Sequence, residues 1–158
     1  MADIIRFNEE NRKWVMPYFG QEHMLKAQEK DSLSSKAYRE ALARNRTLSR
    51  REGLDVPFHK HRLDAIVVPT GGPAWSIDLV NGDAINWDME STSPAAVAGY
   101  PHITVPAGYI FGLPVGISFL GRAWQEPTLI RLAYAFEQAT NVRKPPQFLA
   151  EADLAAVD

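Results

Sequence analysis

The chain has 158 residues, of which 46% are hydrophobic and 23% charged, with a net charge of -2 and no cysteine. These proportions are those of a globular domain and exclude general disorder, and the lack of cysteine excludes disulfides, thiolate nucleophiles and cysteine-ligated metal sites. The charge is too near neutral to indicate a nucleic-acid or membrane partner, and because neither a membrane helix nor a secretory signal is visible, we expect a soluble cytoplasmic protein.

Residues 1–62 are expected to be mainly helical. The spacing of their apolar residues predicts three helices, at 3–15, 21–29 and 34–51. The third helix is expected to end at Gly53, because glycine readily takes the positive φ of a residue that follows a helix.

Residues 36–62 carry eight basic and three acidic side chains, a local net charge of +5. Such a segment is typical of a solvated helix face, and the alternative is a non-enzymatic interaction module that meets phosphates or acidic partners. No interleaved aromatic platform or groove-reading motif accompanies the charges, which favours the solvated face. His59 and His61 are interpreted as its solvated end and not as a zinc site, because His23 and His102 are dispersed along the chain.

Three strands are predicted after residue 63. Residues 65–68 are apolar at consecutive positions, the pattern of a strand that is buried on both faces. Residues 103–105 and 114–120 are the other two strands, and the short connection between them predicts an antiparallel pair. The longer connection from the first strand to the second contains a helix-like stretch at 94–98, and it is compatible with a crossover between parallel strands.

The last predicted element is a helix at 127–138, which has Pro127 in its first turn and an apolar stripe that includes Leu129 and Phe136. Residues 142–158 are expected to form a tail. Together these elements predict an α/β fold, with a partial mixed β-sheet of about three strands and helices packed on it, in a single segment that spans residues 1–158.

The loop after the first strand is a candidate binding element. Gly71 and Gly72 directly follow the strand, loops at the carboxyl ends of strands line ligand crevices in open α/β sheets, and glycine lets the backbone approach a ligand closely. No Gly-Lys-Ser/Thr follows, so the loop is not a phosphate-binding loop of that type. It is compatible with a tight turn or with a binding loop.

The serines give no sign of a nucleophile. Ser76, Ser91, Ser93 and Ser118 all lie outside a G-x-S-x-G elbow. A catalytic triad is assembled in space and not in sequence, so a complete small enzyme with an unrecognised triad stays open as a second hypothesis.

Several segments in order resemble the amidase signature family: DAIVVPTGGPAWSID at 64–78, PAAVAGYPHITVPA at 94–107, GLPVGISFLGR at 112–122 and WQEPTLIRLAYAFEQ at 124–138. The segment 4–28, with FNEEN and MPYFGQE, is similar to the more peptide-amidase-like branch of that family. The resemblance covers nearly the whole chain, but it matches only the C-terminal part of such enzymes.

The resemblance implies amide hydrolysis by a lysine and two serines, one of which follows a cis peptide bond. Both serines lie in a Gly/Ser-rich stretch of the N-terminal half, and that stretch is not found here: Gly71-Gly72 is followed by Pro-Ala-Trp, and Ser34-Ser35 has no glycine beside it. We therefore expect the C-terminal portion of an amide hydrolase, with no catalytic residue of its own and no cofactor or metal. It would supply sheet scaffold and part of the substrate pocket.

The partners that the resemblance implies are a small amide substrate in the full-length parent and either the N-terminal catalytic half or a second copy of the chain. Strands that are apolar on both faces need cover on both faces, which also indicates a missing part. Neither nucleic acid nor a membrane is expected as a partner.

Two segments are expected to border the substrate cleft of the parent, the loop at 71–83 and the segment at 88–100. Both combine glycine or small residues with a few polar groups, next to strand ends. For each acidic residue the alternative is a turn cap or a solvated side chain. The candidate pocket residues are Gly72, Trp75, Asp78, Asp83 and Asp88.

Overall fold

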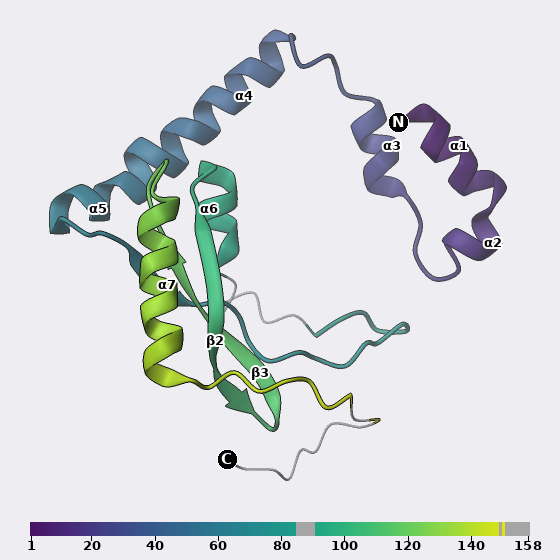
Figure 1. Ribbon diagram of the computed structural model, residues 1–158. Coiled ribbons are helices and arrows are strands. Elements are labelled where there is room, and N and C mark those ends of the chain that lie inside the picture. The colour runs from purple at the N-terminus through teal and green to yellow at the C-terminus, as the bar shows by residue number, and fades with distance from the viewer. Residues whose placement is uncertain (85–90, 149, 151–158) are drawn as a thin grey trace. The chain divides into compact units, whose positions relative to one another are not determined.

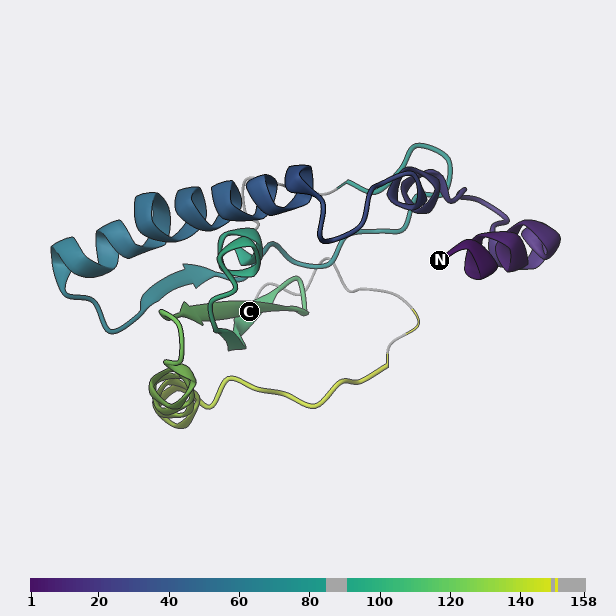
Figure 2. The same ribbon diagram turned by 90° about the horizontal axis from the view of Figure 1, so that it is seen from above.

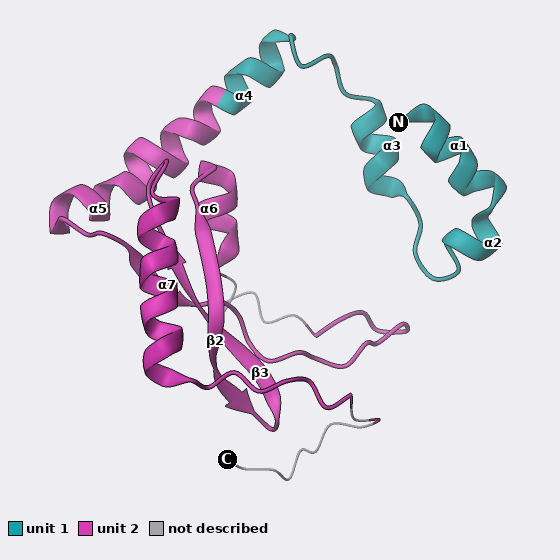
Figure 3. Ribbon diagram, viewed as in Figure 1, with its two compact units in different colours: residues 1–42 teal, residues 43–158 magenta. Residues whose placement is uncertain are grey.

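The computed structural model describes residues 1–84, 91–148 and 150 (Figure 1). The chain divides into two compact units, residues 1–42 and 43–158, and each is described by itself (Figure 3). Their boundary falls inside a helix, α4 (Lys36–Arg46), and not at the change from helical to strand-bearing sequence near residue 63.

The first unit contains three short helices, α1 (Ala2–Glu10), α2 (Arg12–Val15) and α3 (Glu22–Gln28). The single helix expected at 3–15 is therefore interrupted. Asn11 leaves the helical conformation at φ -108° and ψ 20°, and its side-chain amide donates a hydrogen bond to the carbonyl of Phe7. An asparagine that bonds to the backbone in this way competes with the regular helical pattern, which explains the interruption.

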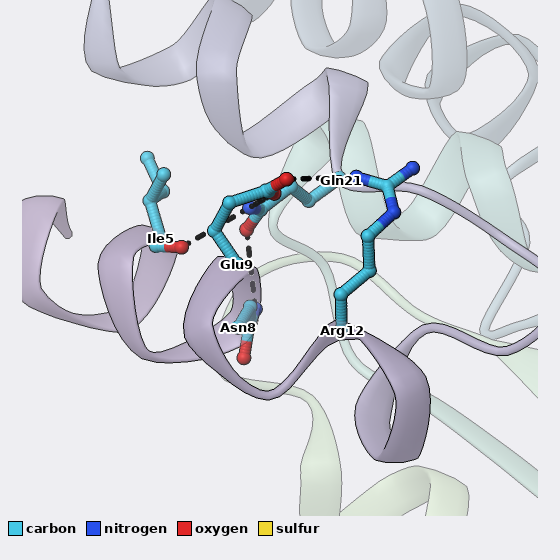
Figure 4. A network of polar contacts seen from close by, with 5 residues as sticks. All are labelled: Ile5, Asn8, Glu9, Arg12 and Gln21. Atoms are coloured by element: carbon cyan, nitrogen blue, oxygen red, sulfur yellow. Dashed lines mark hydrogen bonds and ion pairs between the residues drawn. The ribbon is translucent and has the colours of Figure 1, made fainter.

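A buried glutamine joins α1 to the start of α3 (Figure 4). The side-chain amide of Gln21 donates to the carbonyl oxygen of Ile5 at 3.1 Å and to Glu9 Oε2 at 3.2 Å. Its oxygen accepts a hydrogen bond from Asn8 Nδ2 at 3.2 Å. Gln21 is 9% exposed, and because these bonds satisfy its polar atoms, its burial carries no unpaired group.

The second unit begins with a long helical stretch in which the last part of α4 is followed by a π-helical turn, η1 (Thr47–Leu54), and then by α5 (Asp55–His61). The expected helix end at Gly53 is wrong. Gly53 has φ -111° and ψ -108°, so it forms a kink without positive φ. A Cβ at this position would lie 2.5 Å from the carbonyl oxygen of Leu48, so only glycine allows the backbone to pass this close.

Three strands form one sheet in the order β1-β3-β2: β1 (Ile66–Pro69), β2 (His102–Ile110) and β3 (Leu113–Leu120). Both adjacent pairs are antiparallel, with Val67 and Ile103 opposite Phe119 on either side. The predicted antiparallel pair is confirmed. β1 and β2 run in the same direction, as a crossover requires, but β3 lies between them. The predicted class of fold, helices packed on a sheet of three strands, is also confirmed.

The second strand is longer than expected, because it continues through Pro106 to Ile110. β2 lies at an edge of the sheet, and its register shifts between Pro106 and Gly108. Edge positions and bulges tolerate a proline, whose missing N–H would break the pairing of a central strand. Phe111 and Gly112, both with positive φ, then form the two-residue turn into β3.

Helices cover both faces of the sheet (Figure 2). On one face α7 (Glu126–Thr140) packs on β2 and β3, and the buried residues of this layer are Val105, Phe119, Leu129 and Ala133. On the other face lie α5 and α6 (Thr92–Ala98), and the buried residues are Phe58, Ala95 and Leu120. The final helix and the helix-like stretch at 94–98 are thus where the sequence predicts them.

The first strand is less buried than its apolar sequence predicts. Ile66 and Val68 are partly buried, but Val67 is 51% exposed and Pro69 is also exposed. The physical reason is that Val67 shares the face of Phe119, which α7 covers over β2 and β3. The expected burial on both faces is therefore wrong for the chain by itself. No helix in the described part of the chain is long and apolar enough to cross a membrane.

Candidate functional site

Three hydroxyl groups meet where β1 ends, and we refer to Thr70, Thr104 and Ser118 as the hydroxyl cluster. Ser118 Oγ lies 2.7 Å from Thr70 Oγ1 and 2.9 Å from Thr104 Oγ1, so the cluster joins β2 and β3 to the residue that follows β1. Ser118 is fully buried, whereas Thr104 is exposed. The hydroxyl of Ser118 is therefore bonded to its neighbours, and nothing marks it as a nucleophile.

Gly116 makes room for the hydroxyl cluster. A Cβ at this position would lie 2.7 Å from both Thr104 Cγ2 and Thr70 Oγ1. The carbonyl oxygen of Gly116 also accepts a hydrogen bond from the backbone N–H of Thr70 at 2.9 Å, which extends the pairing one residue beyond β1. These contacts fix the position of Thr70, the residue from which the loop at 71–83 begins.

The segment that leads into α6 returns to the same point. Ser91 Oγ donates a hydrogen bond to the carbonyl oxygen of Thr70 at 3.2 Å, and α6 begins at the next residue. The beginning of the loop at 71–83 and the described part of the segment at 88–100 therefore meet at the carboxyl end of β1. In open α/β sheets, ligands bind in crevices at this end of the strands.

The predicted pocket residues occupy different environments. Trp75 is 47% exposed, and Asp83 is also exposed. A Cβ at Gly72 would have no atom within 4 Å, so no close approach within the described residues requires glycine there. Asp88 lies outside the described residues. The geometry does not test whether these residues contact a substrate, so their place in a pocket stays a prediction.

Asp78 caps a turn inside the loop. Its Oδ1 accepts hydrogen bonds from the backbone N–H groups of Val80 and Asn81, both at 2.9 Å, and its Oδ2 accepts one from Asn81 Nδ2 at 2.9 Å. The bonds from Asn81 and Val80 lower the pKa of Asp78, because they stabilise the charged carboxylate. The turn-cap alternative for this residue is what the structure contains.

The histidines form no recognisable metal site with the other described residues. His59 and His61 lie exposed in the last turn of α5, and within residues 1–84, 91–148 and 150 no three His, Cys, Asp or Glu side chains gather closely enough to hold a metal ion. His102 begins β2, and its buried Nε2 has no hydrogen-bond partner among the described residues.

Sequence reasoning missed a second polar cluster, formed by Arg50, Asp55 and Tyr100. Arg50 Nε donates a hydrogen bond to the carbonyl oxygen of Ala98, and its guanidinium lies over the ring of Tyr100, 5.2 Å from the ring centroid. The hydroxyl of Tyr100 donates to Asp55 Oδ1 at 2.7 Å. From the sequence, Arg50 was interpreted as part of a solvated basic face. The only sequence signal for the cluster was that Asp55 follows Arg50 by five residues.

The fold and these segments define a member of a known enzyme family. A family model described as amidase matches residues 6–130, and the chain therefore belongs to the amidase family. The resemblance found in the sequence is confirmed.

Solved structures make the likeness more specific. The native peptide amidase of Stenotrophomonas maltophilia has 47% sequence identity and a TM-score of 0.83, over 93% of this chain and 29% of that protein. A peptide amidase bound to the competitive inhibitor chymostatin has 48% identity and a TM-score of 0.86, over 93% of this chain and 30% of that protein.

A sequence relative agrees with this likeness. A probable amidase of Arabidopsis thaliana is 39% identical over 152 residues, 95% of this chain and 26% of the relative. The chain thus spans less than a third of the length of this relative and of the two peptide amidases.

Proposed function

We propose that this chain is the C-terminal, pocket-bearing portion of an amide hydrolase that cleaves C–N bonds. The observation that carries this proposal is the match of 93% of the chain to 29% of a peptide amidase at 47% identity. The catalytic lysine and the two serines of the parent then come from polypeptide outside these 158 residues. The partners of the chain are this remaining part of the enzyme and a small amide substrate.

The contribution of the chain to the reaction is to hold the substrate and not to attack it. Amide hydrolysis needs an activated nucleophile and an oxyanion hole, which together supply most of the reduction of the activation barrier. The hydroxyl cluster and Ser91 fix the point from which the loop at 71–83 and the segment leading into α6 extend. These segments form part of the wall of the substrate cleft, and the wall positions the scissile carbonyl for a nucleophile that another segment supplies.

The isolated chain is expected to show no amide hydrolysis. Purified protein would be assayed with peptide amides and aryl anilides and treated with a fluorophosphonate, which labels activated serines. We expect neither turnover nor labelling, because Ser118 bonds to threonine hydroxyls and Ser91 to a backbone carbonyl, and within the described part of the chain neither bonds to a base. Stoichiometric labelling of one serine, abolished by its substitution, would contradict the proposal and favour the complete small enzyme.

A chimaeric enzyme tests whether the chain can support amide hydrolysis when the catalytic residues are supplied. The matching segment of the Stenotrophomonas maltophilia peptide amidase would be replaced by this chain, with the unmodified peptide amidase as the control. We expect the chimaera to hydrolyse peptide amides, because the fold of the replaced segment is retained. A folded chimaera without turnover, measured beside an active control, would count against a pocket-bearing role.

Trp75 is expected to affect substrate binding in that chimaera. Trp75→Ala should raise KM about tenfold with little change in kcat, the result of losing a contact worth about 1.4 kcal/mol in both the ground and transition states. Trp124→Ala is the matched control, because Trp124 is 89% exposed and lies outside the loop. Equal kinetic profiles for the two variants, over substrates of different size, would remove Trp75 from the pocket.

A further inference from the structure

The π-helical turn η1 brings two charged residues to one side of the helix. Arg50 and Asp55 are five residues apart, and in a regular α-helix, with 3.6 residues per turn, this separation turns them about 140° away from each other. At the end of η1 the backbone N–H of Asp55, the first residue of α5, instead donates to the carbonyl oxygen of Arg50. This i→i+5 bond spans the kink at Gly53 and replaces the regular helical register, and the side chains of both residues reach Tyr100.

Tyr100 is held by both of these residues. The guanidinium of Arg50 lies over one face of its ring, and Asp55 accepts the hydrogen bond from its hydroxyl. A cation over an aromatic face and a charge-assisted hydrogen bond are each stronger when partly shielded from water, as they are here. We call Arg50, Asp55 and Tyr100 the π-turn clamp.

The clamp also closes the C-terminal end of α6. Gly99, at φ 64°, ends this helix, and the N–H groups of Gly99 and Tyr100 donate to the carbonyls of Ala96 and Ala95. The carbonyl of Ala98 receives its hydrogen bond from Arg50. A positive charge at this end is favourable, because the helix dipole leaves partial negative charge on its last carbonyls.

The other end of α6 lies at the candidate site. Ser91 precedes the helix and bonds to Thr70 at the end of β1. A helix of seven residues is too short to be stable without tertiary contacts. Its position therefore depends on the clamp at one end, on Ser91 at the other and on the buried Ala95 and Ala98 between them.

We propose that the π-turn clamp positions α6 against the end of β1, and that Arg50 thereby acts as a positioning residue for the wall of the substrate cleft. The link to a substrate rests on the proposed function, whereas the link between the clamp and α6 does not. The irregular turn at 47–54, with its kink at Gly53, is then what lets Arg50 and Asp55 reach Tyr100 together.

Hydrogen exchange in the full 158-residue chain tests the proposal through Arg50→Met. The hydrogen-bonded amides of residues 95–100 should exchange about tenfold faster, because the helix loses a charge-assisted bond at its end. Arg51→Met is the matched control, since Arg51 is exposed and pairs only with its neighbour Glu52 among the described residues. Amides of α7 should be unaffected in both variants. Equal exchange of the amides of residues 95–100 in the two variants would overturn the proposal.

A spectroscopic signature of the clamp gives a second test that does not depend on Arg50. Burial and then Asp55 raise the pKa of the Tyr100 hydroxyl, against the smaller opposing effects of Arg50 and Arg122. Asp55→Asn keeps a hydrogen-bond acceptor but removes the negative charge, so it should lower the pKa of Tyr100. The phenol would be followed by its ultraviolet absorbance, assigned by difference from Tyr100→Phe.

Glu52→Gln, which removes a carboxylate three residues before Asp55 that pairs with Arg51, should leave the pKa of Tyr100 unchanged. If Arg50→Met unfolds the whole chain, so that α7 exchanges faster as well, the Asp55→Asn titration decides: an unaltered pKa of Tyr100 overturns the clamp. Neither measurement uses catalytic activity. A chimaera without amidase activity would therefore refute the proposed function and leave these results as they are.

Discussion

Leu129→Ala is expected to lower the free energy of unfolding by about 2–5 kcal/mol, the range measured for removing a large aliphatic side chain from a packed core. Leu129 is 1% exposed on α7 and packs with Val105, Phe119 and Ala133. The effect would be measured from the midpoint of urea unfolding followed by circular dichroism.

Ile130→Ala is the control for Leu129, because Ile130 is the next residue of the same helix and is 57% exposed. It should change the free energy of unfolding by no more than about 0.5 kcal/mol. Similar losses in the two variants would show that α7 does not pack on the sheet through the face that carries Leu129.

Phe58→Ala is expected to cost about 3–5 kcal/mol of the free energy of unfolding, the range for truncating a buried phenylalanine. Phe58 is 1% exposed on α5, where it packs with Ala95 and Leu120, and the guanidinium of Arg122 lies 5.8 Å from its ring centroid. Loss of the ring therefore removes both a core contact and a cation–π partner. Urea unfolding is again the measurement.

Val56→Ala provides the comparison on α5, since Val56 is 49% exposed. A small effect there and a large effect at Phe58 would show that α5 stabilises the second unit by covering the sheet. Equal effects would mean that only the helical tendency of α5 matters.

Much of the second unit could be predicted because its signals are local. The apolar run at 65–68, the apolar run at 114–120 and the stripe that contains Leu129 each indicate one element directly. The pairing of β2 with β3 followed from the short connection between them. The position of β3 between β1 and β2 did not follow, because strand order depends on contacts between residues far apart in sequence.

The prediction that the third helix ends at Gly53 is wrong because of the local conformation of this glycine. Glycine at the end of an apolar pattern usually marks a C-terminal cap, but here the carbonyl of Leu48 approaches it and the chain continues into α5. A π-helical turn has no recognised local sequence signal. The burial of Phe58 and the clamp on Tyr100 therefore lay beyond sequence reasoning.

For the candidate site the sequence could name two segments, and their place in a substrate pocket stays a prediction. Its two segments could be found from glycine and small residues next to strand ends. The hydroxyl cluster could not, because Thr70, Thr104 and Ser118 look like ordinary strand residues until the register places them side by side. For Asp78 the sequence could supply only the alternatives, and the hydrogen bonds within the loop identify the turn cap.

The strand order also bears on how quickly the sheet can assemble. The turn at Phe111 and Gly112 brings β2 and β3 together with almost no loop to close, and a hairpin of this kind forms in microseconds. β1 must instead find β3 by bringing Ile66 to Leu120, across a connection that includes α6. Because that closure has to be completed before its contacts stabilise the chain, we expect the hairpin to form early and β1 to dock late, making β1 the rate-limiting addition.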